Sequence, residues 1–145
     1  MFFKKILYKV FKSKSEYNAF KTDKVIKKQI SFFNNVCEPE IAKIDKAIKE
    51  RKELNFLHSG HCGDLIYSLP VVKKLSETHK CNFFIRVNKK LNEHYYKHPS
   101  KGVFIDEKMA NLIFPLLKTQ KFINNLGKYN NEKIDINLDF FRELP

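Results

Sequence analysis

Apolar residues follow two different spacings along the chain, and the change falls near residue 52. Before this point they recur every three or four positions, which is the period of an amphipathic helix. After it, short runs of consecutive apolar residues alternate with further segments of helical period. Short buried runs separated by helices are typical of parallel strands joined by helical crossovers. The pattern therefore predicts a helical N-terminal part followed by an α/β domain.

Three helices are predicted in the N-terminal part. Residues 2–12 form a basic amphipathic helix, and Lys14–Tyr17 is interpreted as a polar connection to a second helix over Thr22–Asn34. A third helix begins at Glu38, because Pro39 suits the first turn of a helix and acidic side chains favour the positive end of its dipole.

The second part shows the order β-α-β-α-β. Strands are predicted over Leu54–His58, Asn82–Val87 and Ile134–Leu138, with a helix from Asp64 to about His79 and another opening near Glu107. Strands separated by helices pair in parallel, so we expect an α/β fold with a Rossmann-like parallel sheet.

Two positions in the second part are harder to interpret. Pro70 falls inside a predicted helix, where a proline removes a hydrogen-bond donor and clashes with the preceding turn. We therefore expect a kink or the start of a second helical piece there. The segment Lys121–Tyr129 is ambiguous between a short strand and a turn around Gly127.

These elements suggest two domains. Residues 1–52 form a basic helical extension, and residues 53–145 form a Rossmann-like domain that is apparently incomplete. With 43% hydrophobic residues in 145, the chain has enough apolar side chains to bury a sizeable core.

The net charge of +12 comes from lysine rather than arginine. Among the 28 basic residues only Arg51, Arg86 and Arg142 are arginines. Arginine is the residue preferred for bidentate recognition of phosphates and guanine. An excess of lysine alone is what an AT-rich genome produces, so a nucleic-acid partner is unlikely and composition is the only support for one.

The charge is nevertheless concentrated at the start of the chain. Residues 1–14 contain no acidic residue and combine apolar positions three to four apart with five lysines: Lys4, Lys5, Lys9, Lys12 and Lys14. Such a helix suits an anionic membrane surface, and it also suits packing against its own domain. Both alternatives stay open at this stage.

The cysteine content and the hydropathy of the chain bear on the cellular compartment in which the protein is expected. The three cysteines (Cys37, Cys62 and Cys81) are odd in number and show no CxxC spacing, which favours a reducing environment over a disulfide framework. No apolar run approaches the roughly 18 residues of a membrane span, and the start lacks the features of a signal peptide. We therefore expect a cytoplasmic protein, with peripheral attachment to the inner face of the membrane as a further expectation.

The most distinctive segment is the glycine loop Ser59-Gly60-His61-Cys62-Gly63-Asp64, between the first predicted strand and its helix. In open α/β sheets ligands bind at the carboxyl ends of the strands. We expect Gly60 and Gly63 to adopt backbone conformations that a β-carbon disfavours. Asp64 is expected at the helix start, where its carboxylate lies near free N–H groups and is open to a cleft.

The sequence S-G-x-x-G-D-L-I-Y-S-L-P-V-V-K-K-L from Ser59 resembles the N-terminal motif of glycosyltransferase family 9, the lipopolysaccharide heptosyltransferases and their relatives. The likeness continues at Cys81–Val87, which fits the second strand of that family, and at Lys133–Asp139, which fits a later one. It runs from about Leu54 to about Arg142.

The resemblance implies the acceptor half of a GT-B glycosyltransferase, which transfers a sugar from a nucleotide-sugar to the hydroxyl of a glycan or lipid-linked glycan. It implies inversion, no metal and no cofactor. Asp64 falls on the family's proposed general base, and Ser59, Gly60, His61 and Gly63 are the implied substrate-binding residues. The family places its donor-binding domain downstream, so we expect this chain to be a fragment or a shortened relative, inactive alone.

Other chemistry competes for the same residues. Asp64 is equally explained as a structural helix cap worth ~1 kcal/mol. A zinc site using His58, His61 and Cys62 would lack a second ligand pair, and a buried free Cys62 is commoner than a nucleophile. His61 is either a solvated loop residue or a phosphate contact. The alternative for the whole chain is a non-catalytic interaction or membrane-surface module that retains the fold.

Overall fold

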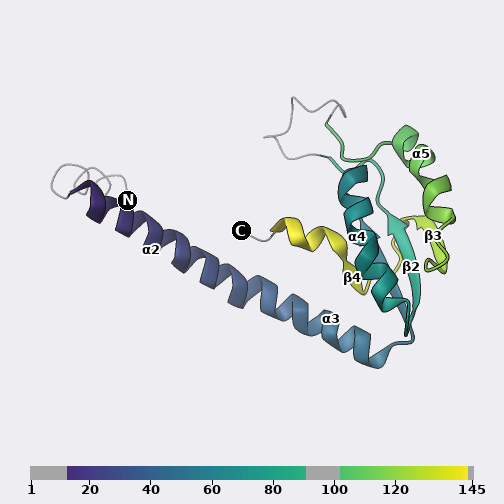
Figure 1. Ribbon diagram of the computed structural model, residues 1–145, viewed down its shortest axis with the longest axis horizontal. Coiled ribbons are helices and arrows are strands. Elements are labelled where there is room, and N and C mark those ends of the chain that lie inside the picture. The colour runs from purple at the N-terminus through teal and green to yellow at the C-terminus, as the bar shows by residue number, and fades with distance from the viewer. Residues whose placement is uncertain (1–12, 91–101, 144–145) are drawn as a thin grey trace. The chain divides into compact units, whose positions relative to one another are not determined.

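The computed structural model describes residues 13–90 and 102–143, and these fall into two compact units (Figure 1). The first unit ends at Ala42, and the second runs from Lys43 to Leu144. The division lies inside a helix rather than at residue 52, because the last turns of that helix contribute Ile44, Ala47 and Ile48 to the core of the second unit.

The first unit is helical. Helix α2 (Lys14–Phe32) is followed directly by a π-helical turn η1 (Phe33–Cys37) and by α3 (Glu38–Glu50). The third predicted helix therefore begins where it was expected. The predicted helix over residues 2–12 lies outside the described residues.

Helix α2 begins earlier than predicted because Ser13 caps it. The Ser13 hydroxyl accepts a hydrogen bond from the Glu16 N–H (3.3 Å), and the Glu16 carboxylate accepts one from the Ser13 N–H (3.1 Å). This reciprocal capping box satisfies two backbone donors at the helix start. The prediction of a polar connection over Lys14–Tyr17 is therefore wrong.

The second unit contains a four-stranded parallel sheet, so the Rossmann-like α/β fold is confirmed. The strands lie in the order β3-β2-β1-β4, and every neighbouring pair is parallel. Their bounds are β1 Glu53–His58, β2 Lys80–Ile85, β3 Asn125–Lys128 and β4 Ile136–Asn137. The order 3-2-1-4 is that of a doubly wound sheet. The ambiguous segment around Gly127 forms the edge strand β3.

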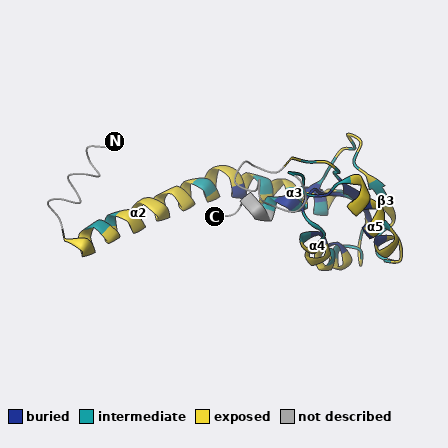
Figure 2. Cartoon of the chain, turned by 90° about the horizontal axis from the view of Figure 1, so that it is seen from above, coloured by how far each residue is buried: buried dark blue, intermediate teal, exposed yellow. Residues whose placement is uncertain are grey.

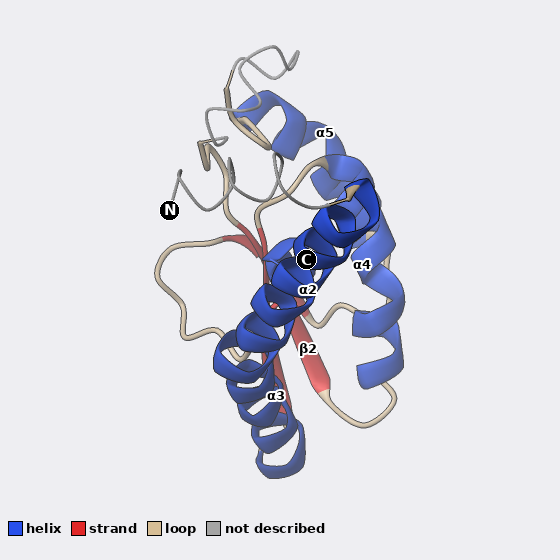
Figure 3. Cartoon of the chain, turned by 90° about the vertical axis from the view of Figure 1, so that its left-hand side faces the viewer, coloured by secondary structure: helices blue, strands red, loops and turns tan. Residues whose placement is uncertain are grey.

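Two helices lie on the same face of the sheet (Figures 2 and 3). Helix α4 (Cys62–Leu75) connects β1 to β2, and α5 (Glu107–Lys118) precedes β3. Helix α4 runs through Pro70 as one element, with the proline side chain exposed, so the expected second helical piece is absent from α4. Asp106 caps α5 by accepting a hydrogen bond from the Met109 N–H (2.7 Å).

The core of the second unit forms between the sheet and these helices. The central strand β1 buries both faces, as the near-continuous apolar run predicts for a parallel strand. Phe56 and Phe83 are fully buried, and side chains of this size each contribute roughly 1.5–3 kcal/mol when removed from water. They pack with apolar residues of both helices: Leu65, Val72, Ala110, Ile113 and Leu117.

An ion pair holds β4 beside β1. Arg51, just before β1, pairs with the buried carboxylate of Asp135, just before β4. The other oxygen of Asp135 accepts a hydrogen bond from the Asn55 N–H (3.0 Å), and the Asn55 amide donates to the Lys133 carbonyl (2.8 Å). The short strand β4 is therefore held at its start by side-chain contacts as well as by its backbone hydrogen bonds to β1. These contacts fix the position of the residues that follow β4.

Candidate functional site

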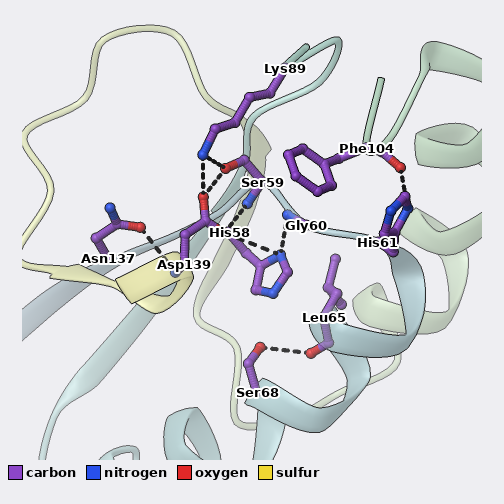
Figure 4. A network of polar contacts seen from close by, with 10 residues as sticks. All are labelled: His58, Ser59, Gly60, His61, Leu65, Ser68, Lys89, Phe104, Asn137 and Asp139. Atoms are coloured by element: carbon purple, nitrogen blue, oxygen red, sulfur yellow. Dashed lines mark hydrogen bonds and ion pairs between the residues drawn. The ribbon is translucent and has the colours of Figure 1, made fainter. Parts of the chain in front are cut away.

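The carboxyl ends of β1, β2 and β4 converge on a polar cluster (Figure 4). Parallel strands end at the same edge of a sheet, so side chains that follow different strands meet there. His58 and Ser59 come from the end of β1, Lys89 follows β2, and Asp139 follows β4. Residues separated by 80 positions in sequence thus share one site.

Asp139 is the centre of this cluster. Its side chain is buried, and it accepts hydrogen bonds from the N–H of Ser59 (2.8 Å) and from the Ser59 hydroxyl. The Lys89 ammonium lies 3.0 Å from both the Asp139 carboxylate and the Ser59 hydroxyl oxygen. A buried carboxylate requires such partners, because an unpaired charge away from water is strongly unfavourable.

Lys89 is positioned by a backbone turn. Asn88 adopts a left-handed conformation (φ 60°), which asparagine tolerates better than most residues, and its N–H donates to the Ile105 carbonyl (2.7 Å). The N–H of Phe104 in turn donates to the Lys89 carbonyl (3.1 Å). These bonds tie the segment after β2 to the segment before α5, so that Lys89 points at the end of β1.

The buried side chain of His58 supports the glycine loop that follows β1. Its Nδ1 accepts a hydrogen bond from the Gly60 N–H (3.0 Å), which requires a neutral ring with its proton on Nε2. The ring is fully buried and stacks on Phe83, with centroids 6.5 Å apart. Within the described residues no group of three or more His, Cys, Asp or Glu side chains could hold a metal ion.

His61 is the N-cap residue of α4, but its side chain does not cap the helix. Its Nδ1 lies 3.0 Å from the carbonyl oxygen of Phe104, and its ring packs edge-on against the Phe104 ring, 5.1 Å between centroids. This contact ties the glycine loop to the segment before α5. The side chain is half-buried, unlike the solvated loop histidine considered from the sequence.

The glycines of the loop differ from the expectation. Within the part of the chain that the structure describes, Gly102 (φ 87°) is the one glycine with positive φ. Gly63 already belongs to α4, which begins two residues before Asp64, and a β-carbon added to it would meet no heavy atom within 4 Å. The prediction that Gly60 and Gly63 need conformations disfavoured by a β-carbon is therefore wrong.

Asp64 lies in the first turn of α4 and lines a pocket of about 350 Å³. The pocket has mostly apolar walls, and Asp64 is the one charged residue among the described residues that line it. The other lining residues come from α3, α4, β4 and the 3-10 helix η3 (Leu138–Glu143): Ile44, Tyr67, Ser68, Val71, Ile136, Asn137, Leu138 and Phe140. An acidic side chain in the first turn suits the positive end of the helix dipole.

The predicted site residues therefore separate into two groups. Asp64 faces the pocket, whereas Ser59, Gly60 and His61 do not line it and instead make hydrogen bonds that shape the loop. Gly63 is exposed in the first turn of α4, beside Asp64.

Sequence reasoning missed Lys89, Phe104 and Asp139. Asp139 follows a predicted strand directly, so the rule that sites gather at carboxyl ends offered a signal for it. Lys89 comes two residues after the predicted strand Asn82–Val87, so the same rule applied to it. No comparable signal marked Phe104, which the hydrogen bonds around the turn at Asn88 bring to the site.

The thiol of Cys62 is not activated. Burial raises the pKa of the Cys62 thiol above its ordinary value, and the nearby carboxylate of Asp106 adds to this increase. Because the thiolate is the reactive form, a raised pKa makes Cys62 a weaker nucleophile at neutral pH. The structural interpretation of this cysteine is the better supported one.

The fold and the site define the chain as a Rossmann-like α/β protein with a polar cluster and a pocket at the carboxyl end of its sheet. No protein-family model matches it, and no match was found among curated proteins or among solved structures. In the described ranges 13–90 and 102–143, no helix combines the length and the apolar character needed to cross a membrane.

Proposed function

We propose that the second unit is the acceptor-side domain of a GT-B glycosyltransferase, in which a sugar passes from a nucleotide-sugar to a glycan hydroxyl. The observation that carries this proposal is the position of Asp64. It lies at the carboxyl end of the central strand β1, in the first turn of α4, and it lines a pocket. A volume of about 350 Å³ falls in the range of small-molecule sites, roughly 300–1,000 Å³.

The helix terminus constrains the chemistry that Asp64 can perform. At the helix start the first role of the Asp64 carboxylate is to orient the acceptor hydroxyl by accepting its hydrogen bond. The proton is taken late, as the departing nucleotide leaves positive character on the sugar carbon and the hydroxyl becomes more acidic. Attack from the face opposite the leaving group inverts the configuration at that carbon.

The remaining predicted residues would support this role. The space beside Gly63 is open, since a β-carbon added there would meet no heavy atom within 4 Å, so a polar substrate group can approach the first turn of α4. Ser59, Gly60 and His61 hold the loop in shape through Asp139, His58 and the Phe104 carbonyl.

The resemblance places the nucleotide-sugar mainly on a second Rossmann-like domain. We therefore assign acceptor binding to the second unit and expect no measurable transfer by residues 1–145 alone. The acceptor would be a cell-envelope glycan or lipid-linked glycan, met on the cytoplasmic side of the membrane. The basic segment 1–14 that suggested membrane contact lies, except for residues 13 and 14, outside the described residues.

A titration of the isotope-labelled chain followed by NMR tests the proposal. We expect a deacylated lipopolysaccharide core oligosaccharide to shift backbone amides in the first turn of α4, and a panel of nucleotide-sugars to leave them unchanged. Asp64→Asn should weaken oligosaccharide binding about tenfold or more, since a hydrogen bond to a charged group is worth roughly 1.5–3 kcal/mol. Its stability should change by less than about 1 kcal/mol.

Asp45→Asn is the matched control, because Asp45 is an exposed aspartate of α3 outside the pocket. It should bind the oligosaccharide as the wild type does. Equal binding by Asp64→Asn and wild type, or amide shifts confined to regions away from α4, would remove the base assignment.

The alternative is a non-catalytic interaction module. One observation favours it: the polar groups of Ser59, Lys89 and Asp139 bond to one another, as they would in a cluster that stabilises the fold. The same titration separates the two functions, because a non-catalytic module would bind neither the oligosaccharide nor a nucleotide-sugar at α4.

A further inference from the structure

Helix α2 is amphipathic, yet it buries none of its residues. Figure 2 shows it exposed along most of its length. Five large apolar side chains of α2 and η1 are 42% to 54% exposed and are spaced so as to share one side of the helix. We call them the apolar stripe: Val25, Ile26, Ile30, Phe33 and Val36. Exposed large apolar side chains that gather on one side of a helix are typical of an interaction site.

Lysines border this stripe. Lys21 and Lys28 lie four residues before and three residues after Val25, so they are its neighbours on the helix surface. Lys24 continues the basic surface away from the stripe. Lys27 lies three residues before Ile30 and borders the other edge of the stripe, where Asp23 offsets its charge at 2.8 Å. Lysine at the edge of an apolar stripe can bury its stem while its ammonium reaches a polar layer.

We infer that the apolar stripe docks on an anionic lipid surface, with the bordering lysines at the level of the headgroups. The positive charge of the helix distinguishes the two partners that could cover the stripe, a second copy of the chain and a membrane. A second copy would bring identical lysine rows together, in a chain whose net charge is already +12. An anionic membrane supplies both the apolar layer and the opposite charge that this arrangement requires. This surface is separate from the acceptor pocket, and its assignment does not depend on the proposed function.

Fluorescence provides a direct test, because the chain contains no tryptophan. Phe33→Trp places a single tryptophan on the stripe, and Asn34→Trp places one at the next position, about 100° further around the helix. With vesicles of 30% phosphatidylglycerol in phosphatidylcholine, we expect the emission of Phe33→Trp to shift to the blue and to be quenched by brominated acyl chains. Asn34→Trp should respond much less, and neutral vesicles should affect neither.

Co-sedimentation with the same vesicles measures the two parts of the surface separately. Lys21→Gln/Lys28→Gln should lower binding about 30-fold, given ~1 kcal/mol for each lysine near an anionic surface. Ile30→Gln/Phe33→Gln keeps helix propensity but removes apolar area, and should lower binding about 100-fold. Leu112→Gln is the matched control, since Leu112 is an exposed leucine of α5, and it should bind as the wild type does.

Three results would overturn the inference. Equal binding to neutral and anionic vesicles would show that the lysines play no part. A blue shift of Phe33→Trp that rises with protein concentration in the absence of lipid would assign the stripe to a second copy. A blue shift that is present at all concentrations without lipid would show that the chain itself covers the stripe.

Discussion

Asp139 combines burial with polar contacts to Ser59 and Lys89, and this makes it the centre of the site. Its carboxylate holds the end of β1 through Ser59 and the segment after β2 through Lys89. This side chain links the segments that follow three strands, in addition to the ladders that pair the strands themselves. One buried carboxylate therefore helps to hold the start of the glycine loop, together with the loop contacts of His58 and His61.

Replacing this carboxylate should destabilise the fold. We expect Asp139→Ala to lower the free energy of unfolding by about 3 kcal/mol, because it leaves the buried Ser59 donors without their acceptor and removes the partner of Lys89. Lys89→Met should cost less, since 38% of the lysine side chain is exposed. Urea denaturation of both variants and of the double variant would measure the coupling between them.

A loss of less than about 1 kcal/mol for Asp139→Ala, with no coupling to Lys89, would contradict this account. It would mean that water replaces the carboxylate without cost, and that the cluster does not hold the strand ends together.

At the scale of single elements, capping residues decide where the helices begin. Ser13 starts α2 and Asp106 starts α5 through hydrogen bonds from their side chains, whereas His61 starts α4 through its backbone alone. The beginning of α4 at Cys62 thus rests on the loop contacts of His58 and His61, and it places Asp64 in the first turn rather than before it.

The cap of α5 gives a test with an internal control. Asp106→Ala removes the acceptor for the Met109 N–H and should lower the stability of the second unit by about 1 kcal/mol. Asp106→Asn retains a capping oxygen and should cost only a few tenths of that amount. The measurement is the urea midpoint of each variant at constant m-value; equal midpoints for Ala and Asn would show that the capping bond contributes nothing.

The accuracy of the sequence predictions varies between elements for physical reasons. The apolar runs of β1 and β2 identify them as strands because buried parallel strands carry apolar residues on both faces. Strand β3 has only four residues, one of them Gly127, so its pattern is too short to separate from a turn. The pairing of Lys89 with Asp139 joins residues 50 positions apart, and local patterns carry no information on such contacts.

At the scale of the whole molecule, the two units differ in what holds them together. The second unit has a core of fully buried apolar side chains around β1 and β2, whereas α2 in the first unit has none. Tertiary burial supplies most of the stability of helices in proteins, and propensity alone makes a helix of about 12–15 residues marginal in water. The first unit therefore has a small stability of its own unless its apolar stripe is covered.

Hydrogen exchange on the full chain would reveal this difference. We expect amides of α2 to exchange through local opening, with protection far below that of β1 and β2, whose amides should require global unfolding. Anionic vesicles should raise the protection of α2 selectively. Protection of α2 equal to that of β1 in the absence of lipid would contradict the expectation.

The two outermost strands of the sheet bear on a different property, the tendency to aggregate. Within the part of the chain that the structure describes, β3 and β4 each have a single neighbouring strand, so each presents one line of backbone groups outward. Such lines act as templates for strands of other molecules when they are long, flat and apolar. Here β4 has two residues and β3 has four, and Asn125, Lys128 and Asn137 place polar side chains on them. The apolar centre of the sheet is thereby flanked by short edge strands with polar side chains, to which a strand of a second molecule can add only poorly.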